Sequence, residues 1–215
     1  YSDPDAAALT AALAEAYGLE PNQVLVTNGS DEALDFAFRT FCSEESGLVF
    51  PDITYGFYPV LAKANGIPFQ EIPLQEGFFL DYKDYLGIHK NIVFANPNAP
   101  TGMAISREEV EEIVKSNPDH IVIVDEAYVD FGGESAVPLI DSYDNLLVCM
   151  TFSKSRSLAG ARVGFIMGNA DLIADMNRLK YATNPYNVNR MSQAMALAAI
   201  KDPTYFRNNC LSIQY

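Results

Sequence analysis

Short apolar segments alternate with longer segments of helical periodicity along most of the chain. An apolar run of four to seven residues bounded by turn residues is typical of a buried strand, and apolar positions three or four apart indicate a helix. The predicted strands are Val24–Thr27, Leu48–Phe50, Phe69–Leu74, Ile92–Ala95, Ile121–Val124, Leu146–Phe152 and Arg162–Met167. The predicted helices are Ala6–Tyr17, Asn28–Phe41, Tyr55–Asn65, a helix begun by Ser106, Asp171–Tyr181 and Asn189–Ile200.

This alternation predicts an α/β fold with a mostly parallel central sheet flanked by helices. Two helix ends carry local signals: Gly18 closes the first helix, and Ser106 with Glu109 three residues later forms a capping box. The predicted strands stop near Asn184–Asn187, and the remainder reads as helical. We therefore place a boundary there, between residues 1–183 and residues 184–215.

Composition and charge exclude several classes of protein. Hydrophobic residues make up 49% of the 215 residues and charged residues 20%, which is ordinary for a globular protein and excludes a disordered or fibrous chain. There are 14 Lys and Arg against 28 Asp and Glu, a formal net charge of −14. A chain this acidic is a poor candidate for binding nucleic acid or an anionic membrane surface. Small molecules or other proteins are the expected partners, and no apolar run approaches a membrane span.

Cysteine usage predicts a cytoplasmic protein with isolated, reduced thiols. Cys42, Cys149 and Cys210 are odd in number and far apart, so they form neither a disulfide framework nor, with two histidines, a zinc module. No metal site is expected. The chain begins without Met and stops at Leu211–Tyr215 without a closing feature, so we expect a fragment or a chain lacking both ends.

Four polar clusters follow or flank predicted strands, where open α/β sheets bind ligands. The first is Asn28–Asp31, between a strand and a helix. Gly29 allows close backbone approach there, and the N–H groups of the first helical turn form an anion site suited to phosphate. The alternative is a simple helix cap made by Ser30 or Asp31.

The second cluster contains an acid, Asp125, and the third contains two basic residues, Lys154 and Arg162. Asp125 directly follows four β-branched residues, so we expect it half-buried and compensated by a metal, a helix N-terminus or a protonated ring nitrogen. The adjacent Glu126 should point the opposite way. Lys154 lies among hydroxyl and small side chains after an apolar strand, where it could act as an amine nucleophile, and Arg162 could hold a phosphate. The alternative is a solvated lysine on a surface loop.

The fourth cluster is Asn96–Gly102, in which two prolines and a glycine fix a turn. Its asparagine side chains face whatever ligand lies above the strand, or the segment is only a turn.

Taken together, these clusters resemble a known family. Thr151–Gly160 is similar at every position to the lysine signature of the fold type I pyridoxal-phosphate-dependent aminotransferases, and Asn96–Gly102 and Asp125–Tyr128 precede it in the order that family requires. Within the family, the chain most resembles the histidinol-phosphate aminotransferases. The supporting segments are Tyr1–Asp5, Asn28–Glu32, Thr54–Tyr58, Asp125–Phe131 and Asn184–Asn189.

The resemblance implies a cofactor, pyridoxal 5′-phosphate, and a role for individual residues. Lys154 would form a Schiff base with the cofactor and then move the proton, Asp125 would pair with the pyridine nitrogen, and Tyr128 would hydrogen-bond the phenolic oxygen. The remaining implied contacts are ring stacking by Tyr55 and phosphate binding by Ser30, Asp31, Ser153 and Arg162. Many family members have a second asparagine where this chain has Ala99, so either Asn98 replaces it or Tyr128 acts alone.

The implied activity is transfer of the amine of histidinol phosphate to 2-oxoglutarate, in histidine biosynthesis. The alternatives of the same fold are an aromatic-amino-acid aminotransferase and a phosphothreonine decarboxylase. Two other classes are a cofactor-binding sensor domain of a transcriptional regulator and an interaction domain with a decayed site. The resemblance also implies a homodimer, with Tyr55–Tyr58 near its interface, an N-terminal arm and a small C-terminal domain. It makes residues 1–183 the cofactor-binding large domain and residues 184–215 the start of the link to the small domain.

Overall fold

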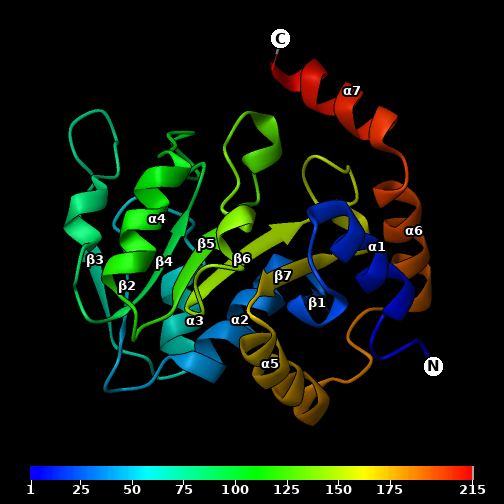
Figure 1. Ribbon diagram of the computed structural model, residues 1–215, viewed down its shortest axis with the longest axis horizontal. Coiled ribbons are helices and arrows are strands. Elements are labelled where there is room, and N and C mark those ends of the chain that lie inside the picture. The colour runs from blue at the N-terminus through cyan, green and yellow to red at the C-terminus, as the bar shows by residue number, and fades with distance from the viewer. Residues whose placement is uncertain (215) are drawn as a thin grey trace.

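Seven short apolar strands pair into one sheet in the computed structural model, which describes residues 1–214 (Figure 1). Their order across the sheet is β1-β7-β6-β5-β4-β2-β3. The strands are β1 (Val24–Thr27), β2 (Leu48–Pro51), β3 (Phe69–Ile72), β4 (Asn91–Ala95), β5 (Val122–Asp125), β6 (Leu146–Thr151) and β7 (Gly164–Gly168). All residues of the central strands β4, β5 and β6 are buried, as expected for strands covered on both faces.

Six of the seven strands run in the same direction, which confirms the mostly parallel sheet. Strands β3, β2, β4, β5 and β6 pair in parallel, whereas β7 is antiparallel to both of its neighbours, β6 and β1. The carboxyl ends of β1, β4, β5 and β6 therefore meet at one edge, together with the amino end of β7.

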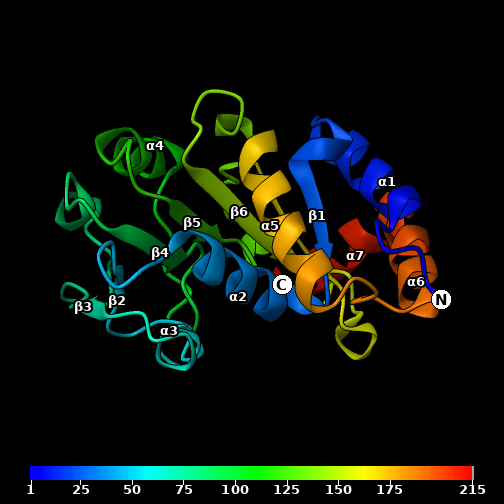
Figure 2. The same ribbon diagram turned by 90° about the horizontal axis from the view of Figure 1, so that it is seen from below.

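Helices cover both faces of the sheet, and alternate strand residues supply the two cores. Val122, Val124 and Val148 belong to the core under α1 and α4, whereas Ile123 and Leu147 belong to the core under α2, α3 and α5. Figure 2 shows α2, α3 and α5 together on one side. The helices are α1 (Ala7–Tyr17), α2 (Gly29–Phe41), α3 (Tyr58–Ala64), α4 (Arg107–Ser116), α5 (Ala170–Thr183), α6 (Arg190–Ile200) and α7 (Pro203–Gln214).

The local helix signals are confirmed. Gly18 adopts a left-handed conformation with φ 71° directly after α1. The Ser106 Oγ accepts from the Glu109 N–H at 3.2 Å, and the Glu109 carboxylate accepts from the Ser106 N–H at 2.8 Å, which completes the capping box of α4. None of the helices described in residues 1–214 combines the length and apolar character needed to cross a membrane.

Several predicted element boundaries were wrong, and three of them have a local reason. Strand β7 begins at Gly164 because Arg162 has φ 52°, which is incompatible with a strand. Helix α3 begins at Tyr58, one residue before Pro59, a proline that favours the first helical turn. Strand β3 ends at Ile72 because Pro73 has no N–H to donate to a neighbouring strand.

Candidate active site

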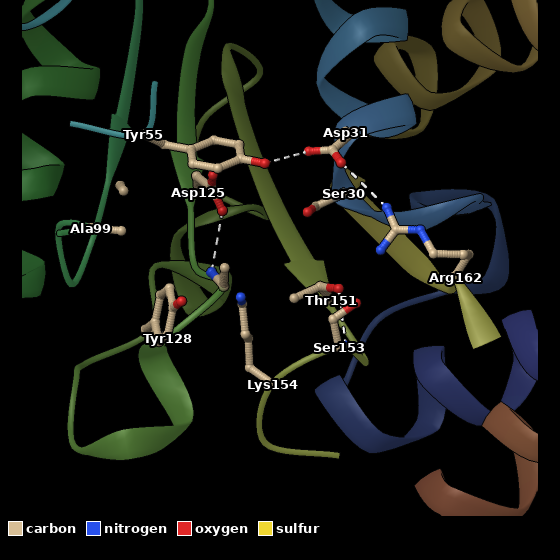
Figure 3. A pocket seen from close by; sticks show the side chains of 12 residues that line it. Ser30, Asp31, Tyr55, Ala99, Asp125, Tyr128, Thr151, Ser153, Lys154 and Arg162 are labelled. Atoms are coloured by element: carbon tan, nitrogen blue, oxygen red, sulfur yellow. Dashed lines mark hydrogen bonds and ion pairs between the residues drawn. The ribbon is translucent and has the colours of Figure 1, made fainter. Parts of the chain in front are cut away.

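The four predicted clusters meet at the shared edge of the sheet and line one pocket (Figure 3). Eight of the nine residues expected to bind the cofactor line it, and Asn98 does not. The lining residues are Ser30, Asp31, Tyr55, Ala95, Ala99, Asp125, Ala127, Tyr128, Thr151, Ser153, Lys154 and Arg162. Thr151 belongs to the predicted lysine cluster but was given no contact of its own; its Oγ1 accepts from the Ser153 N–H at 3.1 Å.

Asp125 lies on the floor of the pocket, at the end of β5, and is more deeply buried than the sequence predicted. Only 4% of it is exposed, rather than half. The Tyr58 hydroxyl donates to its Oδ2 at 2.9 Å, and the Ala127 N–H donates to its Oδ1 at 3.2 Å. Burial raises the pKa of Asp125 from 3.8 to about 6, although both hydrogen bonds act to lower it. A cation beside this carboxylate would offset the cost of burying its charge.

Tyr58 is the functional residue that sequence reasoning missed. It was expected only as part of an interface segment, yet its side chain is 0% exposed and packs edge-on to Phe50 beneath Asp125. The placement of Tyr55–Tyr58 near a subunit interface stays a prediction, but the buried Tyr58 side chain acts within this chain. No local pattern identifies its partner, because 67 positions separate Tyr58 from Asp125.

Glu126 points away from the pocket, as predicted for the residue beside Asp125. Its two carboxylate oxygens accept from the Ser135 hydroxyl at 2.6 Å and from the Ala136 N–H at 2.5 Å. Burial raises its pKa from 4.5 to about 8. Asp125 and Glu126 therefore do not form a paired carboxylate site, and no group of three or more potential metal ligands is found within residues 1–214.

Asp125 should make the cofactor-free protein less stable as the pH rises from about 4 to about 6. Its pKa is raised on folding, so the folded state holds a proton that the unfolded chain releases near pH 3.8, and this stabilisation is lost as the pH passes about 6. Between these limits the free energy of unfolding of Asp125→Asn should rise by up to about 3 kcal/mol relative to wild type. Urea unfolding of both proteins at a series of pH values measures this difference, and parallel profiles would contradict the burial argument.

Lys154 and Tyr128 face each other across the pocket from the ends of β6 and β5. The Lys154 Nζ lies 5.0 Å from the centroid of the Tyr128 ring. The lysine side chain is exposed to the pocket opening, and Figure 3 shows its amine pointing toward Asp125. The amine is thus placed to reach a ligand that lies over Asp125.

The opposite side of the pocket is formed by the start of α2, where the sequence predicts an anion site. The Asp31 carboxylate accepts from the Tyr55 hydroxyl at 2.8 Å and from Arg162 at 3.2 Å, which holds both side chains beside the first turn. The alternative of a simple cap by Ser30 or Asp31 was wrong: Asn28 is the capping position, and no side chain caps the helix. The N–H groups of the first turn are thus not occupied by a capping side chain.

Two glycines let the backbone close around this anion site. A Cβ on Gly29 would lie 2.5 Å from the Arg162 guanidinium, and a Cβ on Gly164 would lie 2.4 Å from the Gly29 carbonyl carbon and 2.5 Å from the Ser30 nitrogen. Only glycine at position 164 allows β7 to touch the start of α2.

Gly164→Ala should therefore destabilise the protein by about 1–3 kcal/mol, the usual cost of overpacking. The added methyl group meets backbone atoms, which cannot rotate away. Gly160→Ala is a matched control because nothing lies within 4 Å of its Cβ position. Thermal unfolding of the two variants should show a lower midpoint for Gly164→Ala only; equal midpoints would contradict the packing.

Asn98 uses its side chain to join its own turn to the segment that carries Ile53 and Thr54. Its amide donates to the Ile53 carbonyl at 2.9 Å and to Thr101 at 3.0 Å, and its carbonyl accepts from Thr54 at 2.8 Å. The neighbouring Ala99 faces the pocket instead. The structure therefore does not place Asn98 where the family's second asparagine would act.

Comparison with known proteins identifies the family. The family model described as aminotransferase class I and II matches residues 1–212. The chain belongs to this family. Its seven-stranded sheet agrees with the fold type I architecture expected of class I and II aminotransferases, because solved aminotransferases superpose on nearly its whole length.

Among relatives, the histidinol-phosphate aminotransferases of Acinetobacter baumannii and Lactococcus lactis are 46% and 47% identical to this chain over 213 residues. Each alignment covers 99% of this chain but 59% and 60% of the relative, so the chain spans about three-fifths of their length. A histidinol-phosphate aminotransferase structure from Sinorhizobium meliloti in complex with pyridoxal-5′-phosphate has a TM-score of 0.87 at 25% identity, covering 99% of this chain and 59% of that one. The putative histidinol-phosphate aminotransferase of Erwinia carotovora gives a TM-score of 0.89 at 27% identity, covering 99% and 64%.

Proposed function

We propose that the protein is a pyridoxal-phosphate-dependent aminotransferase that transfers the amine of histidinol phosphate to 2-oxoglutarate in histidine biosynthesis. The observation that carries this proposal is the pocket itself. A lysine amine, a buried carboxylate and an anion-binding helix start converge there, in a chain 46% identical to histidinol-phosphate aminotransferases.

The residues of the pocket fit this cofactor. The buried Ser153 hydroxyl has no hydrogen-bond partner among the described residues and lies on the anion side, where a phosphate would supply one. Gly29 and Gly164 leave the close backbone approach that phosphate binding at a helix start needs. Burial raises the pKa of Asp125 although two hydrogen bonds act to lower it, and a protonated pyridine nitrogen would compensate the remaining charge.

When bound, pyridoxal phosphate supplies an aldehyde carbon for an amine and a protonated ring that accepts an electron pair. Asp125 would hold the proton of the ring nitrogen in place by its negative charge. Tyr58 favours the ionised carboxylate by donating its hydroxyl hydrogen to Oδ2. Ser30, Ser153 and Arg162 would bind the phosphate, since their polar groups line that side of the pocket.

The remaining residues orient the ring and move the proton. Tyr55 and Tyr128 line the pocket on either side of Asp125, where Tyr55 would pack against the cofactor ring and Tyr128 would donate a hydrogen bond to it. Lys154 would hold the cofactor through Nζ, and the same amine would accept the proton from the Cα of the amine donor.

Three further properties belong to the proposal. Residues 1–183 form the cofactor-binding large domain, and residues 184–215 begin the link to a smaller domain. The protein acts as a homodimer, as cyclic two-fold assemblies are the commonest among oligomeric enzymes. It works in the cytoplasm, with small-molecule amine donor and 2-oxoglutarate as its partners.

The kinetic test compares amine donors on the complete protein. With 2-oxoglutarate as acceptor, kcat/KM for histidinol phosphate should exceed that for phenylalanine or tyrosine by at least about 100-fold. A site built to pair a phosphate leaves its cations unpaired when the donor lacks one. Equal use of the aromatic amino acids would contradict the histidine-pathway assignment and leave the aminotransferase assignment standing. Release of carbon dioxide from phosphothreonine without amino transfer would contradict both.

A further inference from the structure

The turn that carries Lys154 is joined to the segment that carries Tyr128 by one part-buried hydrogen bond. Ser155 directly follows Lys154 and is 1% exposed, and its Oγ donates to Asp130 Oδ2 at 2.5 Å. Asp130 lies in the short helical turn Val129–Phe131, which directly follows Tyr128. Among the described residues, no other hydrogen bond or ion pair joins residues 152–158 to residues 125–131.

The position of the Lys154 amine is set mainly by where the backbone holds its Cα. Its long, exposed side chain has many accessible rotamers, so the reach of Nζ is set largely by where its Cα is held. On one side of the lysine, the Ser153 N–H donates to Thr151 Oγ1 at 3.1 Å. On the other side, the Ser157 N–H donates to the Lys154 carbonyl at 3.0 Å within the turn itself. Ser155 supplies the bond that fixes this turn against the neighbouring strand end.

The hydrogen bond from Ser155 to Asp130 is expected to be strong enough to hold the turn in place. A carboxylate acceptor makes a hydrogen bond shorter and stronger than a neutral acceptor does, and burial of the Ser155 hydroxyl leaves it no competing water. Loss of the bond would free the turn from Tyr128 without removing any atom from the pocket, because neither Asp130 nor Ser155 lines it.

We propose that Asp130 and Ser155 are positioning residues, whose hydrogen bond sets the distance between the Lys154 amine and the Tyr128 side of the pocket. The inference rests on the proposed function of Lys154. Neither residue touches the substrate or the cofactor, so their effect should appear in the speed and geometry of reactions at Lys154 rather than in substrate binding.

The experiment uses the complete enzyme with Ser155→Ala, Asp130→Ala, Asp130→Asn and the double alanine variant. Each single alanine variant should lower kcat about tenfold, the size expected for one hydrogen bond to a charged group, and leave KM for the amine donor within about twofold. The visible circular dichroism of the bound cofactor should weaken. Borohydride trapping of cofactor on Lys154, followed by mass spectrometry, should slow by a similar factor when cofactor is added to the cofactor-free protein.

The variant set separates the hydrogen bond from the charge. Asp130→Asn keeps an acceptor for Ser155, so it should lose no more than about threefold in kcat. The double alanine variant should be no slower than either single variant, because both remove the same contact. Tyr143→Phe is the matched control, since it removes a hydroxyl that donates to the Glu111 carboxylate at 2.7 Å, and neither of these residues lines the pocket. It should change none of these readouts.

Several results would overturn the proposal. One is that Ser155→Ala keeps the kcat, circular dichroism and trapping rate of wild type, or changes only its thermal midpoint. Another is that the losses in kcat add in the double alanine variant. A third is that Asp130→Asn loses as much kcat as Asp130→Ala. These outcomes leave the proposed function intact. Failure of the wild-type protein itself to attach the cofactor would instead contradict the proposed function, and this inference with it.

Discussion

Replacing Lys154 with alanine should abolish amino transfer, with residual turnover below detection. Among the described residues that line the pocket, Lys154 is the one lysine, so the substitution removes both the proposed covalent attachment point and the proposed group that moves the proton. The complete protein should become yellow when pyridoxal phosphate is added, and borohydride should fix the label on the peptide that contains Lys154. Lys154→Ala should bind the cofactor more weakly and show no borohydride-fixed label.

A lysine outside the pocket provides the control. Lys115 lies on α4, exposed, with its amine 3.6 Å from Glu112. Lys115→Ala should retain wild-type turnover and labelling. Label on any other lysine of the wild-type protein, or measurable amino transfer by Lys154→Ala, would show that Lys154 is a solvated loop lysine.

Those parts of the fold and site that depend on residues adjacent in the sequence were predictable from the sequence. The strand Val122–Asp125 and the position of Asp125 at its end follow from a run of β-branched residues that only a buried strand accommodates. The positions of Lys154 and Ser30 followed in the same way, since strand ends of a parallel sheet share one edge.

The remainder depends on contacts between distant segments. Strand β7 runs antiparallel, so Arg162 reaches the shared edge from the beginning of its strand rather than from its end, and strand propensity does not encode direction. The orientation of Asn98 is decided by Ile53 and Thr54, which lie on another segment. The environment of the buried Asp125 depends on Tyr58, whose hydroxyl donates to it from α3.

Asp125→Asn should lower kcat by about 10³-fold or more while the protein stays folded. A neutral amide no longer favours the protonated ring nitrogen, so the electrostatic stabilisation of developing charge is lost. The same substitution should stabilise the cofactor-free protein above about pH 6, because it removes a charge that burial disfavours. Loss of activity with gain of stability in one variant is difficult to produce by misfolding. Turnover near that of wild type would show that Asp125 is only structural.

Tyr58→Phe tests the same role of Asp125 with a smaller expected loss of kcat. The hydroxyl of Tyr58 lowers the pKa of Asp125, so its removal should raise that pKa further and shift the acid limb of the kcat profile to higher pH. Turnover should fall about tenfold, the effect of one hydrogen bond to a charged group. Tyr85→Phe is the matched control, because the Tyr85 hydroxyl is buried without a partner among the described residues and Tyr85 does not line the pocket. If both variants shift the profile equally, the shift comes from loss of a buried hydroxyl in general, and Tyr58 does not act through Asp125.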